Sequence, residues 1–165
     1  MKRLAIIGAG DLGQQIAHYL VDDDHFEVVG FYDDFQKERI NIKGIPALGR
    51  IENVLSAYQA GIFDALLLAI GYKHMAFREE IFNMFKGKVP FGSFVHKTCI
   101  IDPSSKIGQG SVLYPGCILD QHAVLKENVL LNIGCCIAHD TIIGDHCFLS
   151  PRVAIAGFVN VQKCS

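Results

Sequence analysis

The chain has 165 residues, of which 50% are hydrophobic and 19% are charged, so it has enough apolar surface for one or two packed cores, and disorder is excluded as its main state. Fifteen Lys and Arg residues against 17 Asp and Glu residues give a net charge of −2, and because no basic block occurs, nucleic acid is not an expected partner. The longest strongly apolar run, residues 65–70, is too short to span a bilayer, and no leader-cleavage pattern follows Met1. We therefore expect no membrane insertion and a cytoplasmic location.

Short apolar runs alternate with segments of helical spacing in residues 1–92. The pattern predicts strands at residues 4–7, 26–31 and 65–69, and helices at residues 12–20 and 76–85. The second helix is expected to have an apolar side formed by Phe77, Ile81, Met84 and Phe85. Strands that alternate with helices indicate a parallel sheet covered on its faces. Residues 1–92 are therefore predicted to form an α/β, Rossmann-like domain.

A glycine-rich loop joins the first predicted strand to the first predicted helix. It reads Gly8-Ala9-Gly10-Asp11-Leu12-Gly13, and its glycines allow a tight turn in which backbone N–H groups and the helix N-terminus approach a phosphate. Asp33 and Asp34 end the second strand about 20 residues further on, where a carboxylate can bind a ribose hydroxyl or a base edge. Alone, this pattern suggests NAD, but the short domain fits a single nucleotide better. A glycine turn without a ligand, beside a solvated acidic pair, is the alternative.

An aliphatic residue recurs at every sixth position of the second half. The positions are Val95, Ile101, Ile107, Leu113, Leu119, Leu125, Leu131, Ile137, Ile143, Leu149, Ile155 and Val161. Four residues after each of them the side chain is small or β-branched. This period predicts a triangular parallel β-helix, in which the aliphatic residue fills the interior and the small residue sits where the backbone turns a corner. Each of the three sides takes one hexapeptide, so positions that are three hexapeptides apart are expected to stack along the axis.

Six cysteines are present, but the chain has no secretory signal and no two cysteines follow CxxC spacing. We therefore expect reduced thiols rather than a disulfide framework. Cys99, Cys117 and Cys135 are each separated by one full coil and should form one column of small inward side chains. Packing is the preferred interpretation of this column over a metal or redox site, and no metal is expected.

The order of these features resembles the bacterial sugar O- and N-acyltransferases of the NeuD/PglD type, which belong to the hexapeptide-repeat superfamily. The resemblance covers essentially the whole chain. Besides the glycine loop, it rests on Gly30-Phe31-Tyr32-Asp33-Asp34, Ala69-Ile70-Gly71 with Arg78 downstream, Leu131-Asn132, His139-Asp140, Ile143-Gly144-Asp145, Ser150-Pro151 and Ala156-Gly157. It implies that residues 93–165 form a left-handed β-helix with acyltransferase function. It also implies a homotrimer with active sites between neighbouring prisms.

The same resemblance implies acetyl-CoA-dependent acylation of an amino or hydroxyl group on a UDP-linked sugar for surface-glycan synthesis. His139 would be the general base, and Asp140 would orient its imidazole. Gly157 follows His139 by one full coil, so its backbone N–H would lie beside the base and bind the thioester oxygen. The implied substrate-binding residues are Gly8, Gly10, Asp11, Leu12, Gly13, Asp33, Asp34, Gly71, Arg78 and Asn132.

Two features favour a different class of function. Phe148 stands where relatives often have a second histidine, and Ser165 lies five residues into a hexapeptide. We expect a β-helix that is truncated relative to the family and a CoA site that is incomplete. A catalytically impaired nucleotide-sugar-binding module is therefore the alternative to a transferase. A small NAD(P)-binding protein, supported by the glycine loop and Asp33, is a third hypothesis.

Overall fold

The computed structural model describes residues 1–35, 41–42 and 44–165 of the chain. It contains two compact units, Met1–Gly92 and Ser93–Ser165, and each unit has its own hydrophobic core. Among the described residues, no helix combines the length and hydropathy that crossing a membrane requires.

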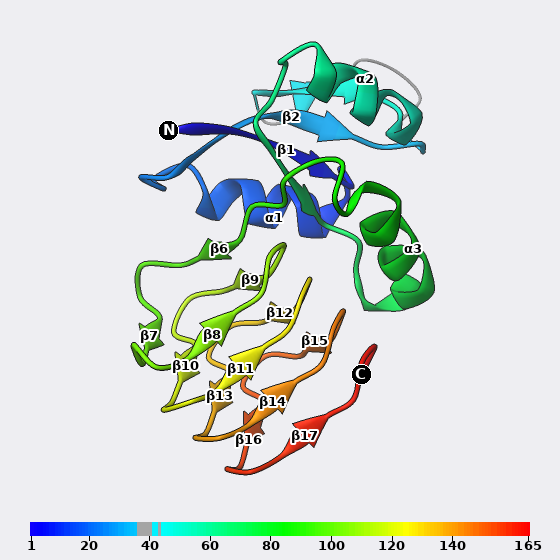
Figure 1. The fold of residues 1–165 in the computed structure, drawn as a ribbon. Helices are drawn as coiled ribbons and strands as arrows, with labels where there is room; N and C mark the ends of the chain where they lie inside the picture. The colour runs from blue at the N-terminus through cyan, green and yellow to red at the C-terminus, as the bar shows by residue number, and fades with distance from the viewer. Residues whose placement is uncertain (36–40, 43) are drawn as a thin grey trace. The chain divides into compact units, whose positions relative to one another are not determined.

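The first unit is an α/β structure built on a sheet with strand order β3-β4-β2-β1-β5. The strands are β1 (Lys2–Ile7), β2 (Phe26–Tyr32), β3 (Asn41–Ile42), β4 (Ile45–Gly49) and β5 (Ala65–Leu68). The helices are α1 (Asp11–Tyr19), α2 (Val54–Gln59) and α3 (Met75–Phe85), with 3-10 turns η1 (Ile51–Asn53) and η2 (Tyr72–His74) (Figure 1). Neighbouring strands are parallel except β3 and β4, which are antiparallel. The three strands and two helices expected from the sequence are confirmed.

Helices cover both faces of this sheet. Side chains alternate between the two faces of a strand, so a strand that is apolar throughout presents apolar side chains on both faces. Ala5 and Ile7 of β1 and Leu66 and Leu68 of β5 form one core with side chains of α2 and α3. Helix α1 lies on the opposite side of the sheet from α2 (Figure 1). The expected apolar side of α3 is partly wrong. Met84 is 43% exposed, and the buried positions of the helix are Arg78, Ile81, Phe82 and Phe85.

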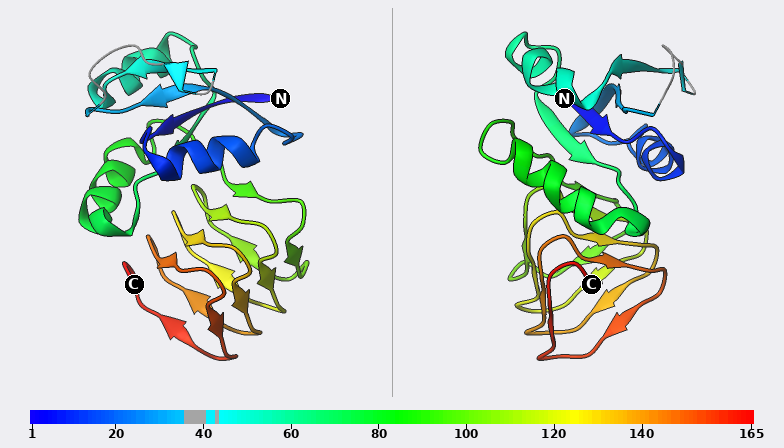
Figure 2. Two further views of the ribbon diagram at one scale, coloured as in Figure 1. Left: turned by 180° about the vertical axis from the view of Figure 1, so that it is seen from behind. Right: turned by 90° about the vertical axis from the view of Figure 1, so that its right-hand side faces the viewer.

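The second unit is a parallel β-helix of short strands. One sheet contains β7 (Ile100–Ile101), β10 (Ile118–Leu119), β13 (Cys136–Ile137) and β16 (Ala154–Ile155). A second contains β8 (Lys106–Ile107), β11 (Val124–Leu125), β14 (Ile142–Ile143) and β17 (Asn160–Val161). The third contains β6 (Phe94–Val95), β9 (Val112–Leu113), β12 (Leu130–Leu131) and β15 (Phe148–Leu149). The coils overlie one another in both views of Figure 2.

Strand register confirms that one coil contains three hexapeptides, since Ile118 pairs with Ile100 on one side and with Cys136 on the other. The aliphatic residues of the sixfold repeat form the interior, where Leu119, Leu131 and Ile137 are at most 1% exposed. The predicted fold class, a Rossmann-like α/β unit followed by a left-handed β-helix, is confirmed.

The small corner residues satisfy backbone groups of the next coil. The Cys117 thiol donates to the carbonyl oxygen of Asn132 at 3.1 Å, and the Cys135 thiol donates to that of Ser150 at 3.2 Å. The Thr141 hydroxyl does the same with Ala156 at 2.7 Å. All six cysteines are free. The cysteine column is therefore part of the packing, and its weak S–H donors are used at the corners.

Candidate functional site

A pocket of about 350 Å³ lies at the carboxyl ends of the parallel strands in the first unit. Crevices at this edge are where open α/β sheets bind ligands. Five of the predicted substrate-binding residues line the pocket: Gly8, Gly10, Asp33, Asp34 and Gly71. The structure thus brings together motifs that lie far apart in the sequence.

The three glycines of the loop have different physical roles. Gly8 has a φ of +103°, and a Cβ there would lie 2.7 Å from the carbonyl oxygen of Ala69. A Cβ at Gly13 would clash with the carbonyl oxygen of Gly8, so both positions need glycine for close packing of loop, helix and strand. Gly10, at the N-cap of α1, has no atom within 4 Å of such a Cβ. Its backbone therefore faces free space, as a ligand-binding position requires.

Both acidic residues of the pocket hold backbone segments in place. Asp33 accepts hydrogen bonds from the N–H of Ala9 at 2.7 Å and from the N–H of Phe35 at 2.8 Å. Asp34 accepts one from the N–H of Ile51 at 2.9 Å and lies 3.7 Å from Nε of Arg50. The two carboxylates therefore tie the glycine loop and the end of β4 to the end of β2. Direct contact of either carboxylate with a ligand stays a prediction.

The remaining predicted residues of the first unit lie outside the lining of the pocket. Asp11 is exposed and Leu12 is half-buried on the first turn of α1. Arg78 is 0% exposed, and its guanidinium donates to the carbonyl oxygen of Ile70 at 2.9 Å. Arg78 thus fixes the segment that follows β5, and its role as a substrate contact stays a prediction.

Three residues with aromatic rings line the pocket but were not predicted from the sequence as site residues. Tyr32 ends β2, His74 lies in η2, and Phe77 lies in the first turn of α3. Tyr32 is 1% exposed, and burial raises its pKa. Tyr32 could have been predicted as a pocket residue, because it directly precedes Asp33 at the end of a strand. His74 and Phe77 could not, because the path of the chain after β5 brings them to the pocket.

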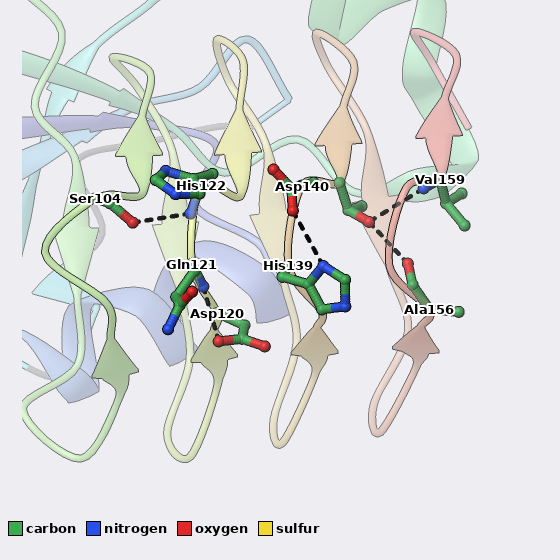
Figure 3. A network of polar contacts seen from close by, with 9 residues as sticks. Ser104, Asp120, Gln121, His122, His139, Asp140, Ala156 and Val159 are labelled. Atoms are coloured by element: carbon green, nitrogen blue, oxygen red, sulfur yellow. Dashed lines mark hydrogen bonds and ion pairs between the residues drawn. The ribbon is translucent and has the colours of Figure 1, made fainter.

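The second predicted site lies at one corner of the β-helix, between β13 and β14. Nδ1 of His139 lies 3.1 Å from Oδ2 of Asp140, and the two side chains are 47% and 40% exposed. Asp140 has a φ of +55°, and residues at the equivalent turn position of neighbouring corners also have a positive φ. The contact engages Nδ1, and Nε2 points away from Asp140 (Figure 3).

Gly157 lies against the His139 ring, as its spacing of one coil predicts. A Cβ at position 157 would lie 2.8 Å from both Cε1 and Nε2 of the imidazole. The absence of a side chain is therefore what lets the ring lie over the next coil. A basic nitrogen and a backbone amide are thus adjacent at this corner.

Polar side chains continue along the same corner toward the first coil. Ser104 accepts a hydrogen bond from the backbone N–H of His122 at 2.9 Å (Figure 3). Its hydroxyl donates to Asp102 at 2.6 Å. The hydroxyl and N–H of Ser104 lower the pKa of Asp102. The Asp140 N–H donates to the carbonyl oxygen of Gln121, so the corner is a continuous hydrogen-bonded ladder. The residues that the structure describes include no cluster of three metal-ligating side chains.

Asn132 lies at a different corner of the prism from His139, because it follows β12 rather than β13. Its side-chain oxygen accepts a hydrogen bond from the N–H of Ile133 at 2.8 Å. The structure of this chain therefore does not bring Asn132 to the His139 corner. Phe148 is a half-buried residue of β15.

Comparisons with known proteins agree with both units. Residues 3–85 match the family described as the PglD N-terminal domain. No curated protein sequence matches the chain. The solved structures that resemble it include PerB from Caulobacter crescentus in complex with CoA and GDP-perosamine, at 21% identity, 97% coverage of this chain, 74% of that chain and a TM-score of 0.86. They also include the acetyltransferase domain of PglB from Neisseria gonorrhoeae with acetyl coenzyme A, at 20% identity, coverages of 99% and 94% and a TM-score of 0.75. WeeI from Acinetobacter baumannii AYE is similar at 21% identity, coverages of 98% and 76% and a TM-score of 0.74.

Proposed function

Because the chain belongs to the PglD N-terminal domain family, we propose that it is a sugar acetyltransferase that uses acetyl-CoA and a nucleotide-linked sugar. The observation that carries the proposal is the His139 corner, where an imidazole oriented by Asp140 lies directly against Gly157. The solved relatives from Caulobacter and Neisseria that bind CoA or acetyl-CoA support this donor. The acceptor is an amino group, with a hydroxyl group as the alternative.

The proposed reaction transfers an acetyl group from sulfur to nitrogen. The sugar amine attacks the thioester carbonyl carbon while Nε2 of His139 takes the proton that the amine loses. The carbon–sulfur bond then breaks, and the sulfur leaves as the CoA thiol once it has received that proton. Asp140 holds Nδ1 during both transfers. The N–H of Gly157 stabilises the negative charge that develops on the carbonyl oxygen.

The pocket of the first unit is proposed to hold the nucleotide of the acceptor. Gly10 offers an open backbone at the start of α1, which suits a phosphate, and the half-buried Phe77 offers an aromatic surface to a base. The expected nucleotide is UDP, whereas the Caulobacter relative holds a GDP-linked sugar. Gly71 also lines the pocket, and a Cβ there would meet only Leu12 at 3.9 Å, so this part of the lining is open.

The test compares wild type with His139→Ala by mass spectrometry of the acetylated sugar, using UDP- and GDP-linked 4-amino sugars. We expect kcat to fall about 10²- to 10⁴-fold in His139→Ala, the range that a general base contributes. His122→Asn is the matched control, since His122 lies one coil earlier on the same corner and Asn suits its φ of +58°. The hydrogen bond from His122 to Ser104 comes from the backbone N–H, so the substitution retains it. Equal turnover by wild type and His139→Ala would refute the assigned base.

Thermal shifts with UDP, a UDP-amino sugar, NADH and acetyl-CoA separate the other functions. A ligand at about 100 times its Kd stabilises the folded state by about 2.7 kcal/mol, which is readily measured. Shifts with a nucleotide sugar and with acetyl-CoA support the transferase. A shift with the nucleotide sugar alone would support the binding module, and a shift with NADH alone would support an NAD(P)-binding protein.

A further inference from the structure

Phe158 is an unusual residue for its place in the β-helix. Its φ is +60°, a left-handed conformation that bulky side chains rarely adopt. The other described non-glycine residues with positive φ in this unit are His122, Asn128, Asp140, His146, Arg152 and Cys164. Phe158 is the only residue of that group with a phenyl ring. It is also 78% exposed, so burial in this chain does not offset the backbone strain.

The ring of Phe158 contacts the imidazole of His139. The two ring centroids lie 5.1 Å apart, and the planes are inclined by 87°, which is the edge-to-face arrangement that aromatic pairs prefer. The backbone N–H of Phe158 also donates to the carbonyl oxygen of His139 at 3.2 Å. Phe158 is thus tied to His139 through both its ring and its backbone.

The imidazole is held by three neighbours of different kinds. Asp140 contacts Nδ1, Gly157 provides the flat backbone surface on which the ring lies, and Phe158 stands perpendicular to the ring. The Asp140 contact alone leaves the half-exposed ring free to tilt about its Cβ–Cγ bond. A perpendicular aromatic ring restricts that tilt.

We propose that Phe158 is a positioning residue for His139. Its ring keeps Nδ1 on Asp140 and keeps Nε2 aimed at the acceptor, and this explains why an exposed aromatic side chain occupies a strained position. The inference rests on the proposed role of His139 as the base. Phe158 acts through that histidine, so it should govern the rate of transfer and leave substrate binding unchanged.

The test uses three variants with purified full-length protein. Phe158→Asn removes the ring but retains a residue type that adopts this conformation, as Asn128 does with a φ of +54°. Phe158→Tyr retains the ring. Arg152→Asn is the matched control, because Arg152 is exposed and has the same φ of +60° at another corner.

For Phe158→Asn we expect kcat to fall about tenfold through loss of orientation, with both KM values within about twofold of wild type and with an unchanged or higher Tm. Phe158→Tyr and Arg152→Asn should keep the wild-type kcat. Loss of activity together with loss of stability, or with a change of oligomeric state, would overturn the proposal, because it would indicate a structural or assembly role.

An NMR measurement tests the contact without relying on turnover. In wild type the Cε1 proton of His139, assigned by its absence in His139→Ala, should show an aromatic ring-current shift that disappears in Phe158→Asn and persists in Phe158→Tyr. Wild-type kcat in Phe158→Asn would overturn this inference alone. Absence of transfer in wild type would overturn the proposed function, and the inference with it.

Discussion

At position 157 a hydrogen atom in place of a side chain leaves room for the imidazole of His139. The ring lies so close that a Cβ would come within 2.8 Å of two of its atoms. The orientation of the proposed base therefore depends on three contacts, none of which buries it: Asp140 at its edge, Gly157 below it and Phe158 beside it.

Gly157→Ala should displace the imidazole by a fraction of an ångström while the chain stays folded, because Gly157 is outside the left-handed region that only glycine tolerates well. We expect kcat to fall about 10- to 100-fold, since a misplacement of about 1 Å costs on this scale. Steady-state kinetics measure the effect. Retained thermal shifts with both substrates serve as the control, and wild-type kcat in this variant would show that the ring position is not critical.

The sequence predicted the positions of some site residues and not of others. The spacing of three hexapeptides placed Gly157 beside His139 correctly, because a β-helix converts sequence distance directly into stacking. No such rule exists for the first unit. Arg78 was expected to contact the substrate, which stays a prediction; in the structure it is buried and donates to the carbonyl oxygen of Ile70. A hydropathy pattern counts arginine as exposed, so it cannot reveal a buried guanidinium.

Among the elements, β1 and β5 are joined by an ion pair at their N-terminal ends. Arg3 on β1 donates from its guanidinium to both carboxylate oxygens of Asp64, which directly precedes β5, at 2.7 and 3.1 Å. The backbone N–H of Arg3 adds a third bond at 2.8 Å. These hydrogen bonds from Arg3 lower the pKa of Asp64 from 3.8 to about 2.

The pair predicts a pH-dependent contribution to stability. A carboxyl group with a lowered pKa in the folded state stabilises the fold above its unfolded pKa of 3.8, and this contribution is lost as the pH falls toward about 2. Asp64→Asn should therefore have a lower Tm than wild type near neutral pH, and the difference should shrink on acidification through this window. Tm values measured in a pH series check this, and a pH-independent difference would contradict it.

Element boundaries in the first unit show what local sequence can predict. The strands β1, β2 and β5 each contain an apolar run and were expected at nearly their observed bounds. The short elements α2, β3 and β4 were not predicted. They lack an uninterrupted apolar run like the Ala65–Leu68 run of β5, and they are too short for an alternation or a helical period to identify them. The apolar side of α3 was misplaced at Met84 because Arg78 belongs to the buried face.

At the scale of the whole molecule, the β-helix isolates three of its six thiols from solvent. Cys117, Cys135 and Cys147 are 0% exposed. The hydrogen bond with Cys135 lowers the pKa of Cys117, but the hydrogen bond with Cys99 and burial together raise that pKa to about 11. The pKa of Cys135 is raised by its hydrogen bond with Cys117 and by burial. Cys99, Cys136 and Cys164, in contrast, are partly exposed.

Alkylation should therefore report the integrity of the prism. In the native protein at about pH 8, where an ordinary thiol is partly ionised, iodoacetamide should modify the partly exposed Cys99, Cys136 and Cys164 first. Cys117, Cys135 and Cys147 should react only in denaturant, because both burial and the raised pKa suppress the thiolate. Peptide mass spectrometry measures the order. Equal native labelling of Cys117 and Cys136 would contradict a closed prism.

The fixed register between coils also restricts how this protein can change in length over evolution. A deletion of one residue after β13 would turn interior side chains of all later strands outward, and Gly157 would leave the His139 ring. Removal or duplication of a whole coil preserves every inside–outside assignment. Length variation in this half should therefore occur in steps of whole coils or as loops that protrude from a corner. The first unit, with separate loops between its strands, can absorb single insertions.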